Sequence, residues 1–171
     1  MNKKIIIGII VAVVIPAAVY AGSPLFINET INEPLPSSAI IKTSEVMEKS
    51  ETMEKSDTMM EKSGTTLALS GSFVGVNDGI HNAEGIAKVI PLDDGGQILR
   101  LEEFKSTNGP DLYVYLATDE KATDYVSLGE LKANIGNQNY EIPEGTDLSK
   151  YDTALVWCKQ FSVLFGHANL S

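Results

Sequence analysis

The chain has 171 residues, with 13 Lys and Arg against 23 Asp and Glu, which gives a formal net charge of −10 at pH 7. This length allows one domain of ordinary size together with additional segments. An acidic chain repels phosphate backbones, and no basic stripe with interleaved aromatic residues occurs, so the sequence argues against nucleic-acid binding. The single cysteine, Cys158, excludes an internal disulfide framework.

Residues 1–22 have the pattern of a membrane-targeting segment. Lys3 and Lys4 precede an uncharged apolar run, residues 5–21, which as a helix would reach about 25 Å, the short limit of a bilayer span. A small-residue pattern near Ala21 also resembles a signal-peptide cleavage site. We therefore expect a single-pass anchor in the cell membrane, with secretion after cleavage as the alternative. The lysines place the rest of the chain on the extracytoplasmic side.

Residues 23–66 are predicted to form a low-complexity stalk. Three prolines in its first part block helix interiors and favour extended backbone, so this part reads as a spacer. The tetrapeptide Met-Glu-Lys-Ser then occurs three times, beginning at Met47, Met53 and Met60. Such a composition cannot bury enough apolar surface to offset the entropy of ordering, so we expect disorder or transient helix. Thioethers also bind copper(I), which gives the repeat an alternative role in metal handling.

Residues 67–171 are predicted to form an all-β domain, because short apolar runs alternate with turn signals and no helical period persists. The turn 93–96, with two adjacent glycines, predicts a hairpin. About seven to nine strands predict a small antiparallel β-sandwich, with a small β-barrel as the alternative. The expected strands are Leu69–Val76, Ile86–Leu92, Ile98–Phe104, Leu112–Leu116, Val126–Leu131, Asn139–Ile142 and the final stretch Ala154–Gly166.

Several short motifs follow one another through this domain at characteristic spacings. They are Gly71-x-Phe73, His81-x-x-x-Gly85, Leu99-x-Leu101-x-x-Phe104, Gly109-Pro110-Asp111-Leu112, Gly136-x-x-x-Tyr140 and Val156-Trp157-Cys158-x-x-Phe161. In this order they resemble the DM-thirteen domain family, a small extracytoplasmic module often found beside DOMON domains. The resemblance implies an all-β fold and an electron-transfer role centred on Cys158. Animal members are often fused to haem-binding DOMON or cytochrome b-type domains, which these 171 residues cannot accommodate, so it also implies a redox partner on a separate protein.

Cys158 is the candidate redox residue. Strand alternation places it on the side of Val156 and Gln160, whereas Leu155 and Trp157 point to the opposite side. The side with the larger apolar residues is predicted to be the core, with Trp157 as its anchor. Cys158 would then lie on a more polar face that solvent or a partner can reach, as thiolate chemistry requires. The alternative is a buried and inert cysteine, since free cysteine is among the most buried residue types.

His81 and His167 are the only histidines and complete the set of candidate ligands. Together with Cys158 they would suit copper or zinc, and either histidine could instead serve as base for the thiol or be merely solvated. The domain contains no methionine, which argues against a blue-copper site of the usual kind. A c-type haem is excluded because no Cys-x-x-Cys-His motif occurs.

These patterns support one leading hypothesis and two alternatives. The leading hypothesis is a membrane-anchored extracytoplasmic module in which Cys158 takes part in electron transfer or thiol redox exchange with another protein. The alternatives are a non-catalytic surface-binding module and a copper-binding protein. Hydrolase and phosphate-binding motifs do not occur, so we expect a redox component rather than a stand-alone enzyme.

Overall fold

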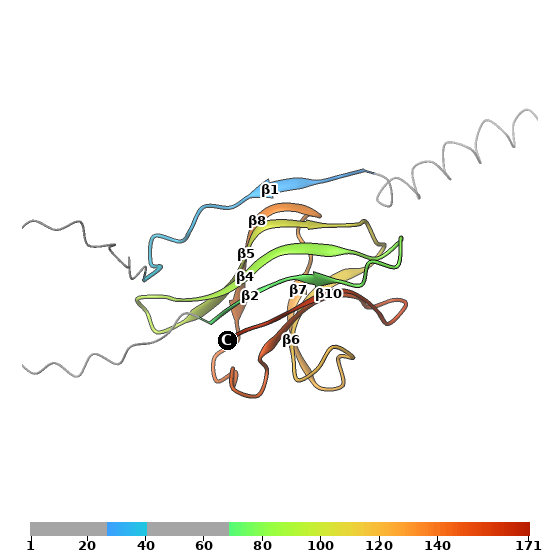
Figure 1. Cartoon of the computed structure of the whole chain (residues 1–171). Helices are drawn as coiled ribbons and strands as arrows, with labels where there is room; N and C mark the ends of the chain where they lie inside the picture. Colours follow the sequence, from blue (N-terminus) through green and yellow to red (C-terminus); the bar gives the residue numbers. More distant parts are fainter. Residues whose placement is uncertain (1–26, 41–68) are drawn as a thin grey trace, which may run out of the picture.

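The computed structural model describes residues 27–40 and 69–171 (Figure 1). The predicted membrane segment 5–21 and the Met-Glu-Lys-Ser repeats lie outside these residues. Within the described part the protein is all β, which confirms the predicted fold class, and no helix there is long and apolar enough to cross a membrane. The strands are β1 Thr30–Asn32, β2 Ser70–Ser72, β3 Val74–Gly75, β4 Ala83–Pro91, β5 Gln97–Ser106, β6 Leu112–Ala117, β7 Tyr125–Glu130, β8 Ile135–Ile142, β9 Thr153–Cys158 and β10 Val163–Asn169.

The strands form two five-stranded sheets that pack as a β-sandwich. Sheet I has the order β1-β8-β5-β4-β2, and sheet II has the order β3-β10-β9-β6-β7. All neighbours are antiparallel except β1 and β8, which run parallel. The strands β5 and β9 are therefore central, each covered on both edges by neighbouring strands.

The core lies between the two sheets and follows strand alternation. From sheet I, Leu99 and Leu101 of β5 point inward, and Ala154 and Val156 of β9 meet them from sheet II. All four side chains are fully buried. Burial of apolar surface of this kind is the main driving force for folding. The two-residue period that predicted these strands thus identifies one buried face on each central strand.

The predicted strand Leu69–Val76 is divided between the two sheets. β2 pairs with β4 in sheet I, whereas β3 pairs with β10 in sheet II. Phe73 lies at the crossing, where its buried ring packs edge-on against Phe104 with 5.4 Å between centroids. One segment therefore joins the two layers along one edge of the sandwich, because it supplies an edge strand to each sheet.

The predicted hairpin and the predicted final strand have different outcomes. The hairpin at 93–96 is confirmed between β4 and β5, where Gly95 takes a φ of +88° and the Leu92 amide donates to the Gly96 carbonyl. The final stretch, predicted as one strand, is instead a hairpin of β9 and β10 with an exposed turn at 159–162. Ser162 in this turn has a φ of +54°, which is a left-handed conformation. The turn contains neither glycine nor asparagine, the residues that usually adopt this conformation, so the sequence did not indicate it.

Residues 27–40, here called the N-terminal strap, lie against sheet I rather than extending freely as the proline-rich spacer was expected to do. Figure 1 shows β1 beside β8 at the edge of this sheet. Gly136 permits this approach, because its φ is +107° and a Cβ at that position would lie 1.9 Å from the Ile31 carbonyl oxygen. The strap is therefore part of the folded domain.

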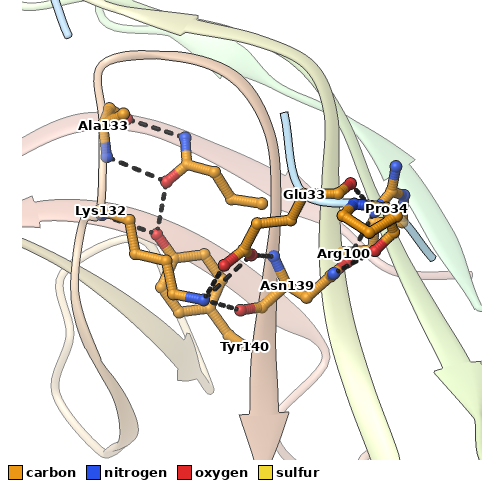
Figure 2. A network of polar contacts seen from close by, with 8 residues as sticks. Glu33, Pro34, Arg100, Lys132, Ala133, Asn139 and Tyr140 are labelled. Carbon is orange, nitrogen blue, oxygen red and sulfur yellow. Dashed lines mark hydrogen bonds and ion pairs between the residues drawn. The ribbon is translucent and has the colours of Figure 1, made fainter. Parts of the chain in front are cut away.

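Polar contacts fasten the strap to the outer face of sheet I (Figure 2). The Glu33 carboxylate accepts hydrogen bonds from Lys132 Nζ at 2.8 and 3.0 Å and from the Asn139 amide at 2.6 Å. Asn139 Nδ2 donates to the Pro34 carbonyl at 2.9 Å. Arg100, only 6% exposed beneath the strap, donates to the Glu33 carbonyl and to Asn139 Oδ1. The buried guanidinium group of Arg100 therefore has hydrogen-bond partners, as burial requires.

Candidate functional site

Cys158 is the last residue of β9, and it is 1% exposed. The strand register pairs it with Leu112 of β6 on one side and with Val163 of β10 on the other. Its side chain belongs to the core between the sheets, together with that of Val156. The prediction that Cys158 lies on a face open to solvent is therefore wrong.

The reason for this error lies in the size of the side chains on β9. The prediction assigned the larger residues, Leu155 and Trp157, to the core. In the structure the face of β9 that meets sheet I carries the smaller residues Ala154, Val156 and Cys158, because sheet I fills the interior with its own large side chains. Leu155 and Trp157 instead join a second apolar cluster on the outer face of sheet II.

The burial of Cys158 limits its chemistry in the resting fold. Thiol–disulfide exchange requires a thiolate to approach the sulfur of its partner directly, and a core position does not allow that approach. Lys159 follows in the chain but points to the other face, where its Nζ lies 4.7 Å from the centre of the Tyr113 ring. Cys158 therefore packs as a small apolar side chain while the sandwich is closed.

His81 lies in the loop between β3 and β4. Its Nδ1 is 2.7 Å from Asp78 Oδ2, and its ring packs edge-on against Phe165 with 4.8 Å between centroids. Backbone and ring hydrogen bonds from His81 hold the pKa of Asp78 at about 2, below its ordinary value of 3.8. His81 thus has a local partner in an ionised carboxylate.

His167 lies on β10, opposite Leu155 of β9. Directly opposed residues share a face of the sheet, so His167 lies on the outer face of sheet II while Cys158 points inward. Its Nε2 is 3.1 Å from Glu120 Oε1. Across residues 27–40 and 69–171, no group of three or more His, Cys, Asp or Glu side chains is arranged to hold a metal ion. The structure therefore does not bring Cys158, His81 and His167 together.

The outer face of sheet II carries a line of aromatic side chains, here called the aromatic row, formed by Tyr125, Tyr115, Tyr113 and Trp157. Tyr125 stacks on Tyr115 with 4.2 Å between ring centroids and 18° between planes. Tyr115 and Tyr113 follow at 6.0 Å. Trp157 of β9 lies directly opposite Tyr113 of β6. Tyr115 is buried within this row, whereas Tyr113 and Trp157 are half-buried and Tyr125 is exposed.

The tyrosines of the row differ in their polar surroundings. The Tyr113 hydroxyl donates a hydrogen bond to Glu130 Oε1 at 3.1 Å, and this bond to a carboxylate raises the pKa of Tyr113. Burial, followed by the neighbouring Tyr125, raises the pKa of Tyr115 to about 12. Both phenols are thus held in the protonated form at neutral pH, but only Tyr113 has a carboxylate to receive its proton.

Sequence reasoning missed the aromatic row. The signal was present, because Tyr113 and Tyr115 alternate with buried aliphatic residues on β6, and Leu155 and Trp157 do the same on β9. Pairing β6 with β9 in antiparallel register would have placed these two tyrosines on the same face as Leu155 and Trp157. The assignment of Trp157 to the core concealed this, and the structure corrects it.

A family model described as "Electron transfer DM13" matches residues 72–170. The chain belongs to this family. The matched region contains β3 to β10 and therefore nearly the whole of both sheets. No curated protein and no solved structure matches the chain. Membership of the DM13 family supports a general role in electron transfer or redox chemistry.

One DM13-like motif, Gly109-Pro110-Asp111-Leu112, supports the end of β9 at which Cys158 lies. The Lys159 amide donates to the Asp111 carbonyl at 2.9 Å, and Leu112 is the register partner of Cys158. A Cβ on Gly109 would lie 2.8 Å from the Leu112 side chain and 2.9 Å from the Phe165 ring. A cavity of about 270 Å³ opens beside this motif and is lined by Pro110, Leu112 and Glu130 among others. In this DM13 domain the motif therefore pairs with the last residue of β9 and with the first residue of the turn that follows it.

Proposed function

We propose that this chain is an extracytoplasmic electron-transfer module, held at the cell membrane by residues 5–21, with Cys158 as a redox residue that is protected in the closed fold. Membership of the electron-transfer DM13 family supports the general role. The lysines before the apolar run support the orientation, since basic residues favour the cytoplasmic side. A separate redox protein would be the partner.

The location of Cys158 at the end of β9 is the observation that supports this role. The next four residues, 159–162, form an exposed turn that contains the left-handed Ser162. Strand ends and exposed turns open more readily than the centre of a sheet, because few buried contacts hold them. Separation of this turn would expose the sulfur atom to a partner without unfolding the sandwich. Exchange with a partner thiol or disulfide would then take place only in the opened form.

The rate at which a thiol reagent labels Cys158 in the full chain tests this role. Local opening exposes little surface, so the labelling rate should rise only weakly with urea, whereas global unfolding would give the steep dependence of complete surface exposure. Ser162→Gly removes the strain of the positive φ and should slow labelling, and Ser162→Val should accelerate it. If labelling follows global unfolding in all three proteins, Cys158 is a structural residue.

The anchoring also makes a spatial prediction. Only six peptide links separate Ala21, at the end of the apolar run, from Ile27, the first residue of the strap, so they span at most about 20 Å. The domain would therefore lie close to the bilayer, with residues 41–68 as an insertion between β1 and β2 rather than as a tether. Resistance of the chain to alkaline extraction from membranes would support the anchor, and its release would contradict it.

A further inference from the structure

The aromatic row offers a redox element distinct from the thiol. Its members belong to three adjacent strands, β7, β6 and β9, and the successive tyrosine rings are 4.2 and 6.0 Å apart between centroids. Phenol and indole rings are the side chains, apart from thiols, that give up single electrons most readily. The three tyrosine rings in this proximity offer a route across the outer face that begins at the exposed Tyr125 and ends at Tyr113, and the half-buried Trp157 lies opposite Tyr113 on β9.

Tyr113 is the member of the row with a proton acceptor. Its hydroxyl donates to Glu130 Oε1 at 3.1 Å, within the range for proton transfer. Among the ion pairs between described residues, none includes Glu130. Its carboxylate is therefore not neutralised by a neighbouring ammonium group, whereas that of Asp124 is paired with Lys150.

The charges around Tyr113 favour the joint loss of an electron and a proton. Removing an electron alone would leave a positively charged ring, and the Lys159 ammonium group lies 4.7 Å from the ring centre, where it repels that charge. Transfer of the phenolic proton to Glu130 avoids this state, because the oxidised ring is then neutral. The hydrogen bond and the cation thus act in the same direction.

We propose that Tyr113 is a proton-coupled redox residue, with Glu130 as its proton acceptor and the aromatic row as its electron path. An outer-sphere one-electron oxidant, of the class of high-potential metal complexes, removes one electron from Tyr113. The phenolic proton moves to Glu130, which leaves a neutral tyrosyl radical, a protonated carboxyl group and an oxidant reduced by one electron. Return of an electron and the same proton restores the pair. The assignment rests on the electron-transfer role proposed above but does not involve Cys158.

Tyr151 provides a matched comparison within the same chain. Its hydroxyl also donates to a carboxylate, Asp124 Oδ1 at 3.2 Å, and Lys150 lies 4.5 Å from its ring centre. Here, however, Lys150 Nζ binds Asp124 directly at 2.7 Å, and this hydrogen bond lowers the pKa of Asp124. Asp124 is therefore a poor proton acceptor, and no aromatic ring of the described residues stacks on Tyr151. Its oxidation should be slower.

Flash photolysis of the full chain in detergent with tris(bipyridine)ruthenium and a sacrificial electron acceptor tests the proposal. The ruthenium(III) ion formed in the flash is the oxidant, and transient absorption and electron paramagnetic resonance distinguish tyrosyl from tryptophanyl radicals. We expect the native chain to form a tyrosyl radical that Tyr113→Phe removes. Glu130→Gln should slow its formation by about 100-fold and abolish the solvent deuterium isotope effect. Tyr151→Phe and Asp124→Asn should change neither.

The outcomes separate this proposal from the role of Cys158. An unchanged radical yield in Tyr113→Phe, or its loss in Tyr151→Phe, would overturn the assignment of Tyr113. An unchanged rate and isotope effect in Glu130→Gln would overturn the assignment of Glu130. Cys158→Ser should leave the tyrosyl signal intact, so failure of thiol labelling and failure of radical formation are independent results. Circular dichroism of each variant confirms that the sandwich is retained.

Discussion

The two sheets differ most on the faces that point away from the core. Sheet I carries charged and amide side chains on its outer face, where the N-terminal strap covers Arg100. Arg100 donates hydrogen bonds to the Glu33 carbonyl of the strap and to Asn139 of β8. Sheet II carries aromatic side chains on its outer face, where no described strand covers them. One face is therefore closed by polar contacts with the chain itself, and the other keeps oxidisable rings near the solvent.

This difference indicates that the outer faces of the two sheets contribute to stability in different ways. Polar networks of the kind seen on sheet I fix geometry and contribute stability that depends on pH and salt. Apolar contacts of the kind seen on sheet II contribute stability that hardly depends on either. If the aromatic row also transfers electrons, function lies on the face that is held mainly by apolar contacts. The following predictions test this contrast.

The largest effect is expected from Tyr115→Ala on sheet II. Tyr115 is 2% exposed and packs against Tyr125 and Leu155, so its truncation leaves a cavity and should lower the free energy of unfolding by about 3–5 kcal/mol. Urea denaturation measures this change, which should be the same at low and high salt. Tyr115→Phe keeps the ring and should cost far less. A loss that shrinks markedly in high salt would show that the outer face of sheet II is not held by apolar packing.

On sheet I, Arg100→Met tests the polar network. Methionine keeps an aliphatic side chain but leaves Asn139 Oδ1 and the Glu33 carbonyl without their donor and Glu102 with Lys88 alone, so we expect a loss of about 2–4 kcal/mol. Lys88→Met removes a more exposed partner of Glu102 and should cost at most about 1 kcal/mol. The two losses can be compared by chemical denaturation at two salt concentrations. Equal losses would mean that the strap does not bury Arg100.

The sequence predicted the parts of this fold that depend on alternation and turn chemistry. The apolar periods of β5 and β6 and the glycines of the 93–96 turn gave the correct elements. Alternation shows that a strand has two different faces but not which face is covered, because that depends on the residues of the other sheet. This is why Cys158 was assigned to the wrong face. The turn at 159–162 lacks glycine, proline and asparagine, and β1 follows no apolar period, so neither carried a signal.

Gly136→Ala tests whether the strap is held by close backbone packing as well as by polar contacts. Gly136 has a φ of +107°, and a Cβ would meet the Ile31 carbonyl oxygen at 1.9 Å, so β1 should detach from β8 with a loss of about 2 kcal/mol. Gly145→Ala is the matched control, because its φ is +80° but nothing lies within 4 Å of the added atom. Hydrogen exchange at the Glu33 amide, which donates to the Asn137 carbonyl, reports detachment. Equal protection in both variants would contradict close packing of the strap.

The smallest effect is a pH dependence that belongs to sheet I. Burial raises the pKa of Glu33, but hydrogen bonds from Lys132 and Asn139 outweigh burial, so the pKa lies below its ordinary value of 4.5. A carboxylate with a lowered pKa contributes stability above the pKa of the unfolded chain and loses it as pH falls through the folded value. Glu33→Gln should therefore lower stability at pH 7 by about 1 kcal/mol.

The difference in stability between Glu33→Gln and the native chain should become smaller as the solution is acidified below pH 4.5. At such pH values the native carboxylate becomes protonated and loses its charge, so it resembles the uncharged glutamine. Thermal denaturation across this pH range measures the difference. Glu144→Gln, at an exposed position outside the strap contacts, is the control and should follow the native profile. A constant difference between Glu33→Gln and the native chain at every pH would mean that Glu33 acts through shape rather than charge. The polar contacts between the strap and sheet I would then not be the cause of the pH dependence of stability.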